Sequence, residues 1–223
     1  MQKLSKAYTV ISYVFAAAFL LMYFAAEIVP DFFLSTFGRL FLLCGGCGFL
    51  WLGGFFLAKK NGNNLPMRIN LRIFLILYFL LFATLTLFDP LWGRNGGFVI
   101  WNRELFDAYV QNGLNLIPFK TIVQYFSRGT ISQFVVNIIG NLLCLMPLGI
   151  LLPLNFEKQR RTGIFLLTCV FIVAAVEIIQ FATLSGSCDI DDLILNVFGA
   201  FLLYLFTKNR EAFGLLKQIF LLE

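Results

Sequence analysis

The sequence predicts an all-α membrane protein with six transmembrane helices, and three observations lead to that prediction. Of its 223 residues 60% are hydrophobic and only 13% are charged, against about 25% charged residues in soluble domains. Six apolar runs are long enough to cross a bilayer, and basic residues gather on one side of them. So few polar side chains cannot cover a large soluble core, and lipid must therefore solvate much of the chain.

Each apolar run has the length that a spanning helix needs. About 20 residues at a rise of 1.5 Å cross the roughly 30 Å hydrocarbon core. The first run follows Lys3 and Lys6 as a signal peptide would, but it is too long for that role, and we predict an uncleaved helix. The predicted spans are 9–29, 38–58, 69–88, 131–154, 163–184 and 190–207.

The basic residues predict the orientation of these spans. With a cytoplasmic N-terminus, twelve Lys and Arg residues fall in inside segments and five in outside segments, which fits the positive-inside rule. Both termini are then expected in the cytoplasm. The same rule accounts for the net charge of +5 without a nucleic-acid partner. The inside residues are Lys3, Lys6, Lys59, Lys60, Arg68, Arg72, Lys158, Arg160, Arg161, Lys208, Arg210 and Lys217, and the outside residues are Arg39, Arg94, Arg103, Lys120 and Arg128.

A turn-rich linker at 61–66 predicts a boundary between a two-helix N-terminal part (1–62) and a four-helix core (69–207), with an amphipathic cytoplasmic tail at 208–223.

The segment 91–130 is long for a structureless loop. Its seven aromatic residues favour short helices in the outer head-group layer. They are Phe98, Trp101, Phe106, Tyr109, Phe119, Tyr125 and Phe126.

Two residue types limit the possible chemistry. The chain has no histidine, which excludes Ser-His and Cys-His nucleophile pairs and His-ligated zinc. Cys44 and Cys47 have the spacing of a redox pair, but they lie in an apolar run with no charge to stabilise a thiolate. Small residues at a helix contact explain that segment better. No disulfide framework is predicted from the five cysteines.

The last three spans carry polar residues, whereas the first three carry almost none. These residues lie about 6 to 15 Å below the outer boundary, apart from Asp192 near the surface. At 100° per residue, Asp189, Asp192 and Asn196 share one stripe and Asp191 points elsewhere. We therefore predict a polar cluster that opens to the outside, formed by Asn137, Asn141, Glu177, Gln180, Asp189, Asp192 and Asn196.

For Asn137, Asn141 and Gln180 taken singly, interhelical hydrogen bonding explains the amides better than a functional role, and Asp189 can cap the sixth helix. Glu177 and Asp192 differ, because two carboxylates at neighbouring depth repel unless a proton, a cation or a basic group separates them. Arg128, Lys120 or a hard cation such as Mg²⁺ or Ca²⁺ can serve. Glu177 is expected to contact the 189–196 stripe and Asn137 or Asn141.

A second candidate site precedes the fourth span, in the segment from Asn115 to Thr121. Pro118 can begin a helix at its first position, Phe119 would lie at the interface, and Lys120 would reach phosphates. On physical grounds alone, a simple loop-to-helix entry explains the segment better.

Four motifs in order resemble the VanZ-like family of bacterial membrane proteins over about 69–207. They are Asn115-Leu-Ile-Pro118-Phe119, Asn137-Ile-Ile-Gly140-Asn141 with Met146-Pro147-Leu148-Gly149, Glu177-Ile-Ile-Gln180, and Asp189-Ile-Asp191-Asp192 with Asn196 and Gly199. The resemblance implies a plasma-membrane protein that lowers sensitivity to teicoplanin. Relatives often carry an arginine before the acidic run, where this chain has Ser185-Gly186-Ser187-Cys188.

The sequence thus leads to one main functional expectation and two alternatives. We expect an outward-facing polar pocket that binds a cell-wall lipid precursor or a lipophilic glycopeptide among membrane lipids. The first alternative is an enzyme acting on a lipid-linked substrate, with Glu177 and Asp192 as acid and base or as metal ligands. A transporter is the last choice, because the inner half of the spans is apolar.

Overall fold

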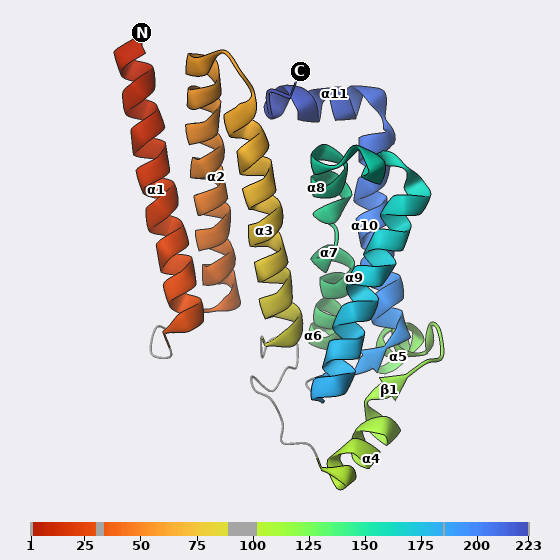
Figure 1. The fold of residues 1–223 in the computed structure, drawn as a ribbon. Coiled ribbons are helices and arrows are strands. Elements are labelled where there is room, and N and C mark those ends of the chain that lie inside the picture. Colours follow the sequence, from red (N-terminus) through yellow and green to blue (C-terminus); the bar gives the residue numbers. More distant parts are fainter. Residues whose placement is uncertain (1, 30–33, 89–101, 185, 223) are drawn as a thin grey trace. The chain divides into compact units, whose positions relative to one another are not determined.

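The six spans are confirmed by a computed structural model, which describes residues 2–29, 34–88, 102–184 and 186–222 (Figure 1). In the described part, six helices are long and apolar enough to cross a membrane. Two residues of the predicted interfacial segment, Phe98 and Trp101, lie outside the described residues. The spans are α1 (Gln2–Ile28), α2 (Thr36–Asn61), α3 (Leu65–Leu87), an interrupted fourth span (Ile131–Asn155), α9 (Thr162–Thr183) and α10 (Ile190–Lys208).

The chain forms two compact units. The first comprises Met1–Leu77 with Glu211–Glu223, and the second comprises Tyr78–Arg210. The division falls within α3, so the linker at 61–66 lies inside the first unit, and the tail helix α11 (Arg210–Ile219) begins at the division.

In the first unit, α1 and α2 pack through aromatic rings and small residues. Tyr8 stacks on Phe56 with ring centroids 5.4 Å apart, and Gly45 leaves room for the ring of Phe19. The segment around Cys44 thus has the helix-contact role predicted for it, and both Cys44 and Cys47 are free thiols. The tail helix is held by a hydrogen bond of 3.2 Å from Trp51 Nε1 to the Ile219 carbonyl.

In the second unit, α10 packs against the fourth span at two glycines. A Cβ at Gly199 would collide with the Leu142 carbonyl oxygen, and a Cβ at Gly149 would lie 2.6 Å from the Ala200 carbonyl oxygen. Both positions therefore require glycine for close backbone approach. One turn after Ala200, Tyr204 of α10 stacks on Phe165 of α9 with ring centroids 4.2 Å apart.

The fourth span is interrupted twice. It comprises α6 (Ile131–Phe134), a π-helical turn at Val135–Ile139, α7 (Gly140–Cys144) and, after a break at 145–147, α8 (Leu148–Asn155). Backbone groups that a break frees inside a membrane need new partners. Tyr78 Oη supplies one, because it donates a 2.7 Å hydrogen bond to the Cys144 carbonyl.

Several short elements gather where α9 ends and α10 begins, and we call this region the acidic end. The strands β1 (Leu114–Asn115) and β2 (Cys188–Asp189) pair in parallel there. The helix α4 (Arg103–Asn112) precedes β1 and α5 (Lys120–Arg128) follows it (Figure 1). Helices in the loop before the fourth span and in the tail are thus present, as predicted.

Candidate functional site

Asp191 is the most deeply buried carboxylate of the acidic end, with none of its surface exposed. It accepts hydrogen bonds from the backbone N–H groups of Phe119, Thr121 and Ile122, at 2.5, 2.7 and 3.1 Å. These donors lie at the N-terminus of α5, which has no side-chain cap of its own. Asp191 therefore occupies the anion position at this helix end and fixes α5 to the start of α10.

Asp189 connects the same two segments through side chains. Its Oδ1 accepts from Asn115 Nδ2 at 2.8 Å, and its Oδ2 accepts from Thr121 Oγ1 at 2.6 Å. It also caps α10, as predicted, by accepting the Asp191 N–H at 2.9 Å. Because Asp189 is 6% exposed, all three bonds are shielded from water and the loop 113–122 is firmly held.

Glu177 lies against the start of α10. Its Oε2 accepts the Asp189 backbone N–H at 3.0 Å, and the residue is 8% exposed. The structure thus brings Glu177 to the 189–196 segment, as expected from the sequence. Burial and then the negative charge of Glu177, which also accepts a hydrogen bond from the thiol, raise the pKa of Cys188 to about 11.

A separate amide network joins the fourth span to α10. Asn141 Nδ2 donates to Asp192 Oδ1 at 2.6 Å, and Asn196 Nδ2 donates to Asn141 Oδ1 at 3.2 Å. Asn137 lies in the π-helical turn and donates to the Gln133 carbonyl at 2.9 Å, within its own span. The stripe of Asp192 and Asn196 therefore faces Asn141, whereas the described bond of Asn137 is local.

Gln180 forms the kind of interhelical hydrogen bond that the sequence favours for it. Its Nε2 donates to the Thr86 carbonyl near the end of α3, at 2.8 Å. Gln180 thus joins α9 to α3 by an interhelical hydrogen bond within this unit. In the described part of the chain, Gln180 Oε1 and Asn196 Oδ1 are buried acceptors without a donor, which costs about 1–3 kcal/mol for each group.

Pro118 does not begin a helix, and that prediction is wrong. The residues Ile117 to Lys120 form a turn closed by a 3.3 Å bond from Lys120 N to the Ile117 carbonyl, and α5 begins only at Lys120. Phe119 has φ 65 and ψ 0, the third-position conformation of a type II turn, which normally requires glycine. The Asp191 carboxylate stabilises this conformation by accepting the Phe119 N–H.

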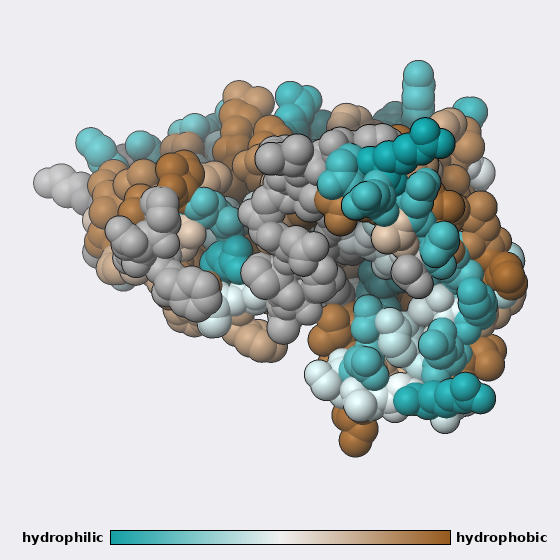
Figure 2. Space-filling model, turned by 90° about the horizontal axis from the view of Figure 1, so that it is seen from below, coloured by the Kyte–Doolittle hydropathy of each residue, from teal (hydrophilic) through white to brown (hydrophobic). Residues whose placement is uncertain are grey.

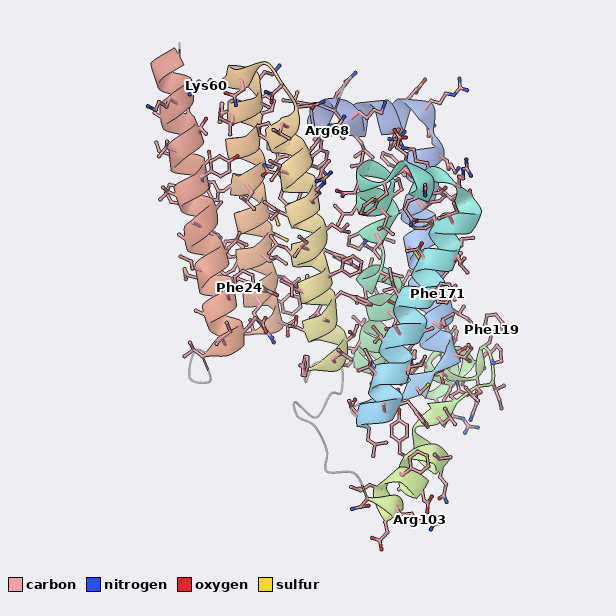
Figure 3. The ribbon with its side chains drawn as sticks, in the orientation of Figure 1. Phe24, Lys60, Arg68, Arg103, Phe119 and Phe171 are labelled. Atoms are coloured by element: carbon pink, nitrogen blue, oxygen red, sulfur yellow. The ribbon has the colours of Figure 1, made fainter. Side chains whose placement is uncertain are left out.

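The clamped loop and the adjoining helix α5 together present an exposed edge that is both apolar and basic. Its exposed apolar side chains are Leu116, Ile117, Phe119, Val123 and Phe126. Lys120 is exposed beside them, and Phe119 points away from the helices (Figure 3). In Figure 2, hydrophilic and hydrophobic side chains lie next to each other over this face. The edge has the composition of a surface that lies at a membrane interface.

The opposite side of α5 faces the carboxylates. Burial, and then the charges of Asp192 and Asp189, raise the pKa of Tyr125. Lys120 and Arg128, the expected cationic partners, are exposed, and neither lies within 4.0 Å of a carboxylate oxygen of a described residue. In the described part, no group of three His, Cys, Asp or Glu side chains can hold a metal ion.

Sequence reasoning named Asp191 and Thr121 only as members of their motifs and gave neither a role in the site. Asp191 and Asp189 both bind the segment that contains β1 and the start of α5, whereas Asp192 and Asn196 contact Asn141 of the fourth span. The predicted stripe therefore holds for Asp192 and Asn196, and Asp189 faces a different element. One local signal was available. The N-cap position of α5 is Phe119, which has no side-chain oxygen to accept a backbone N–H, whereas Ser, Thr, Asp or Asn usually occupies this position. The N–H groups at the start of such a helix need an acceptor from a distant residue.

Comparison with known proteins agrees with this geometry. The VanZ/LLP1 family matches residues 73–213, which is more than half of the chain and contains every residue of the acidic end described above. The chain belongs to the VanZ/LLP1 family. It is a multi-pass membrane protein with six spans.

A curated VanZ/LLP1 relative, Protein VanZ of Enterococcus faecium, is 34% identical over 94 residues. The matched part makes up 42% of this chain and 52% of the relative, so the chain spans about half the length of the curated relative it matches. No solved structure matches the chain.

Proposed function

We propose that this VanZ/LLP1 protein binds a cell-wall lipid head group, or a lipophilic glycopeptide, at the outer face of the bacterial plasma membrane. Through this binding it modulates susceptibility to glycopeptides such as teicoplanin. The observation that carries the proposal is the loop 113–122. Two buried aspartates, Asp189 and Asp191, hold this loop in place, while its outer edge remains exposed.

The edge has the chemistry that such ligands require. Lys120 offers an ammonium group to a phosphate or carboxylate, and Phe119 and Val123 offer apolar surface to an acyl or polyprenyl chain. A clamped edge loses little conformational entropy on binding. The strained backbone of Phe119 fits a binding role as well. Backbone strain persists where surrounding contacts hold the strained conformation in place, and such positions are concentrated at functional sites.

The described contacts favour binding over catalysis. An acid and base pair of Glu177 and Asp192 must reach a substrate. Instead Glu177 accepts the Asp189 N–H, and Asp192 accepts Asn141 Nδ2. Both bonds serve to hold the acidic end together.

The proposal is tested in a glycopeptide-sensitive host that expresses the full chain at a confirmed membrane level. Wild-type protein should raise the inhibitory concentration of teicoplanin severalfold, with vancomycin measured in parallel. Phe119→Ala and Lys120→Gln should remove most of that increase. Arg103→Gln, which removes an exposed charge from α4, is the matched control and should retain it. No change in susceptibility to either drug by the wild-type protein would refute the proposal.

The proposed orientation has its own test. Single cysteines are introduced at Lys120 and Lys208 in a variant whose natural cysteines are replaced. A membrane-impermeant thiol reagent added to intact cells should label position 120 and not position 208. The reverse pattern would place the acidic end in the cytoplasm and contradict an outward-facing site.

A further inference from the structure

The first unit contains a cavity of about 220 Å³ at the turn between α2 and α3, far in sequence from the acidic end. All its lining residues belong to that unit. They are Ala58, Lys59, Gly62, Asn63, Asn64 and Leu221. The proposed function makes no use of this cavity.

The polar wall of the cavity offers hydrogen-bond donors. Asn63 Oδ1 accepts the Leu65 N–H at 3.2 Å, and Asn64 Oδ1 accepts Arg68 Nε at 3.2 Å. Because each amide oxygen is engaged by a donor, the amide orientation is fixed and the NH₂ groups remain to donate. Lys59 also lines the cavity, and its ammonium group, which lies 5.7 Å from the Phe55 ring centroid, is carried on a flexible stem that can turn toward an anion. Such a wall suits an anion.

The charge around the cavity also suits an anion. No aspartate or glutamate occurs between residues 32 and 88, whereas four basic residues occur between 59 and 72. Lys60 and Arg68 lie where α2 turns into α3 (Figure 3). The helix α11 carries Arg210, Glu211 and Lys217, a net charge of +1, and thus adds to this excess.

The other wall is apolar. Ala58 is 4% exposed, and Leu221 follows α11, whose end is held to α2 by the bond from Trp51 to the Ile219 carbonyl. An apolar wall beside a cationic one is poorly matched to a fully hydrated ion. It matches the junction of a phosphate with a hydrocarbon chain.

We propose that this cavity binds the phosphate of one anionic phospholipid, with Lys59, Asn63 and Asn64 as donors and Leu221 against the glycerol or the start of an acyl chain. Its volume lies below the roughly 300–1,000 Å³ of pockets for drug-sized ligands. It therefore accommodates a head group while the chains remain in the bilayer. The inference holds for either orientation of the protein, because it depends only on the cavity.

The test is native mass spectrometry of the purified full chain in detergent, with phosphatidylglycerol or phosphatidylcholine added at equal concentrations. Wild-type protein should retain one phosphatidylglycerol severalfold more than phosphatidylcholine. Lys59→Gln should abolish this preference. Lys60→Gln is the matched control, because it removes the same charge from the same last turn of α2 but does not line the cavity, and it should keep the preference.

Three results would overturn the proposal. Equal retention of the two lipids would show no recognition of negative charge. An equal loss with Lys59→Gln and Lys60→Gln would show diffuse attraction to a basic surface. Displacement of the lipid by millimolar inorganic phosphate or glycerol phosphate would show a site for a free anion. Lipid retention by Asn64→Ala measures the contribution of the amide to binding. Thermal unfolding of the same variant shows whether its stability has changed. None of these results bears on glycopeptide susceptibility.

Discussion

Thr121 and Asp191 lie 70 residues apart in sequence, and the backbone N–H of Thr121 donates a 2.7 Å hydrogen bond to Asp191 Oδ2. A carboxylate on one helix thus serves as the N-terminal cap of another. The bond joins the loop before the fourth span to the start of the sixth, and both residues lie within the family-matched part of the chain. The position of the exposed edge therefore depends on a residue that is itself inaccessible.

The first prediction concerns the removal of that carboxylate. Asp191→Ala should lower the free energy of unfolding by at least about 2 kcal/mol, because three buried backbone N–H groups lose a charged acceptor. Asp191→Asn keeps one oxygen and should lose less. Thermal unfolding in detergent measures both, and hydrogen exchange of the amides at 119–122 should accelerate. Asp107→Ala, at an exposed position on α4, should change neither quantity.

Periodicity and composition explain why most of the fold could be predicted. A span must hide its backbone and present about 20 apolar residues to lipid, which leaves a pattern in any sequence. The shared face of Asp192 and Asn196 follows equally from 100° per residue, whereas Asp189 precedes the helix in an extended conformation and contacts Asn115 and Thr121. Asp191 could not be assigned in this way, because its role depends on where a distant helix begins. The break at 145–147 cannot be predicted from periodicity either, because it depends on Tyr78 from another helix, which donates a hydrogen bond to the freed Cys144 carbonyl.

The second prediction concerns the backbone strain at Phe119. A left-handed conformation costs a non-glycine residue roughly 1–2 kcal/mol, and Phe119 has φ 65. Phe119→Gly removes this strain from the folded state but increases the conformational entropy of the unfolded chain. The free energy of unfolding should therefore be unchanged or higher by up to about 1 kcal/mol. Phe119→Val should be clearly destabilising, because a β-branched side chain fits the left-handed region poorly. A Phe119→Gly variant less stable than Phe119→Val would contradict the assigned turn.

The Phe119→Gly variant also separates fold from function. If the exposed ring contacts the ligand, the glycine variant should remain folded and lose the increase in teicoplanin tolerance. Retained tolerance in a folded Phe119→Gly protein would instead limit the ligand contacts to other residues of the edge, such as Lys120 and Val123.

The third prediction concerns the glycine contact between α10 and the fourth span. Gly199→Ala should destabilise the protein by about 1–3 kcal/mol, because the new Cβ meets the Leu142 carbonyl and the helices must move apart. Gly48 in α2 has no neighbouring atom within 4 Å of the position that a Cβ would take, so Gly48→Ala is the control. That substitution should be neutral or stabilising by up to about 1 kcal/mol, since alanine favours a helix more than glycine does. Equal unfolding temperatures for the two variants would exclude the close contact.

The last prediction concerns the reactivity of the Cys188 thiol. Burial is the largest cause of its high pKa, followed by the charge of Glu177 and the hydrogen bond to it, so the thiol should remain protonated until about pH 11. Thiolate is the reactive form. In a variant whose other cysteines are replaced, alkylation by a small neutral reagent should therefore still rise about tenfold per pH unit up to pH 10. A plateau near pH 9 would contradict the assigned environment.

Glu177→Gln tests the cause of that shift. The amide oxygen can still accept the Asp189 N–H, so the fold should be retained. Loss of the negative charge makes the thiolate less unfavourable, which lowers the pKa of Cys188 and should increase the alkylation rate at pH 8.5 severalfold. Glu157→Gln removes the same charge from an exposed position outside the acidic end and should leave the rate unchanged. Because burial is the larger cause, even the Glu177→Gln thiol should react more slowly than the thiol of the unfolded chain.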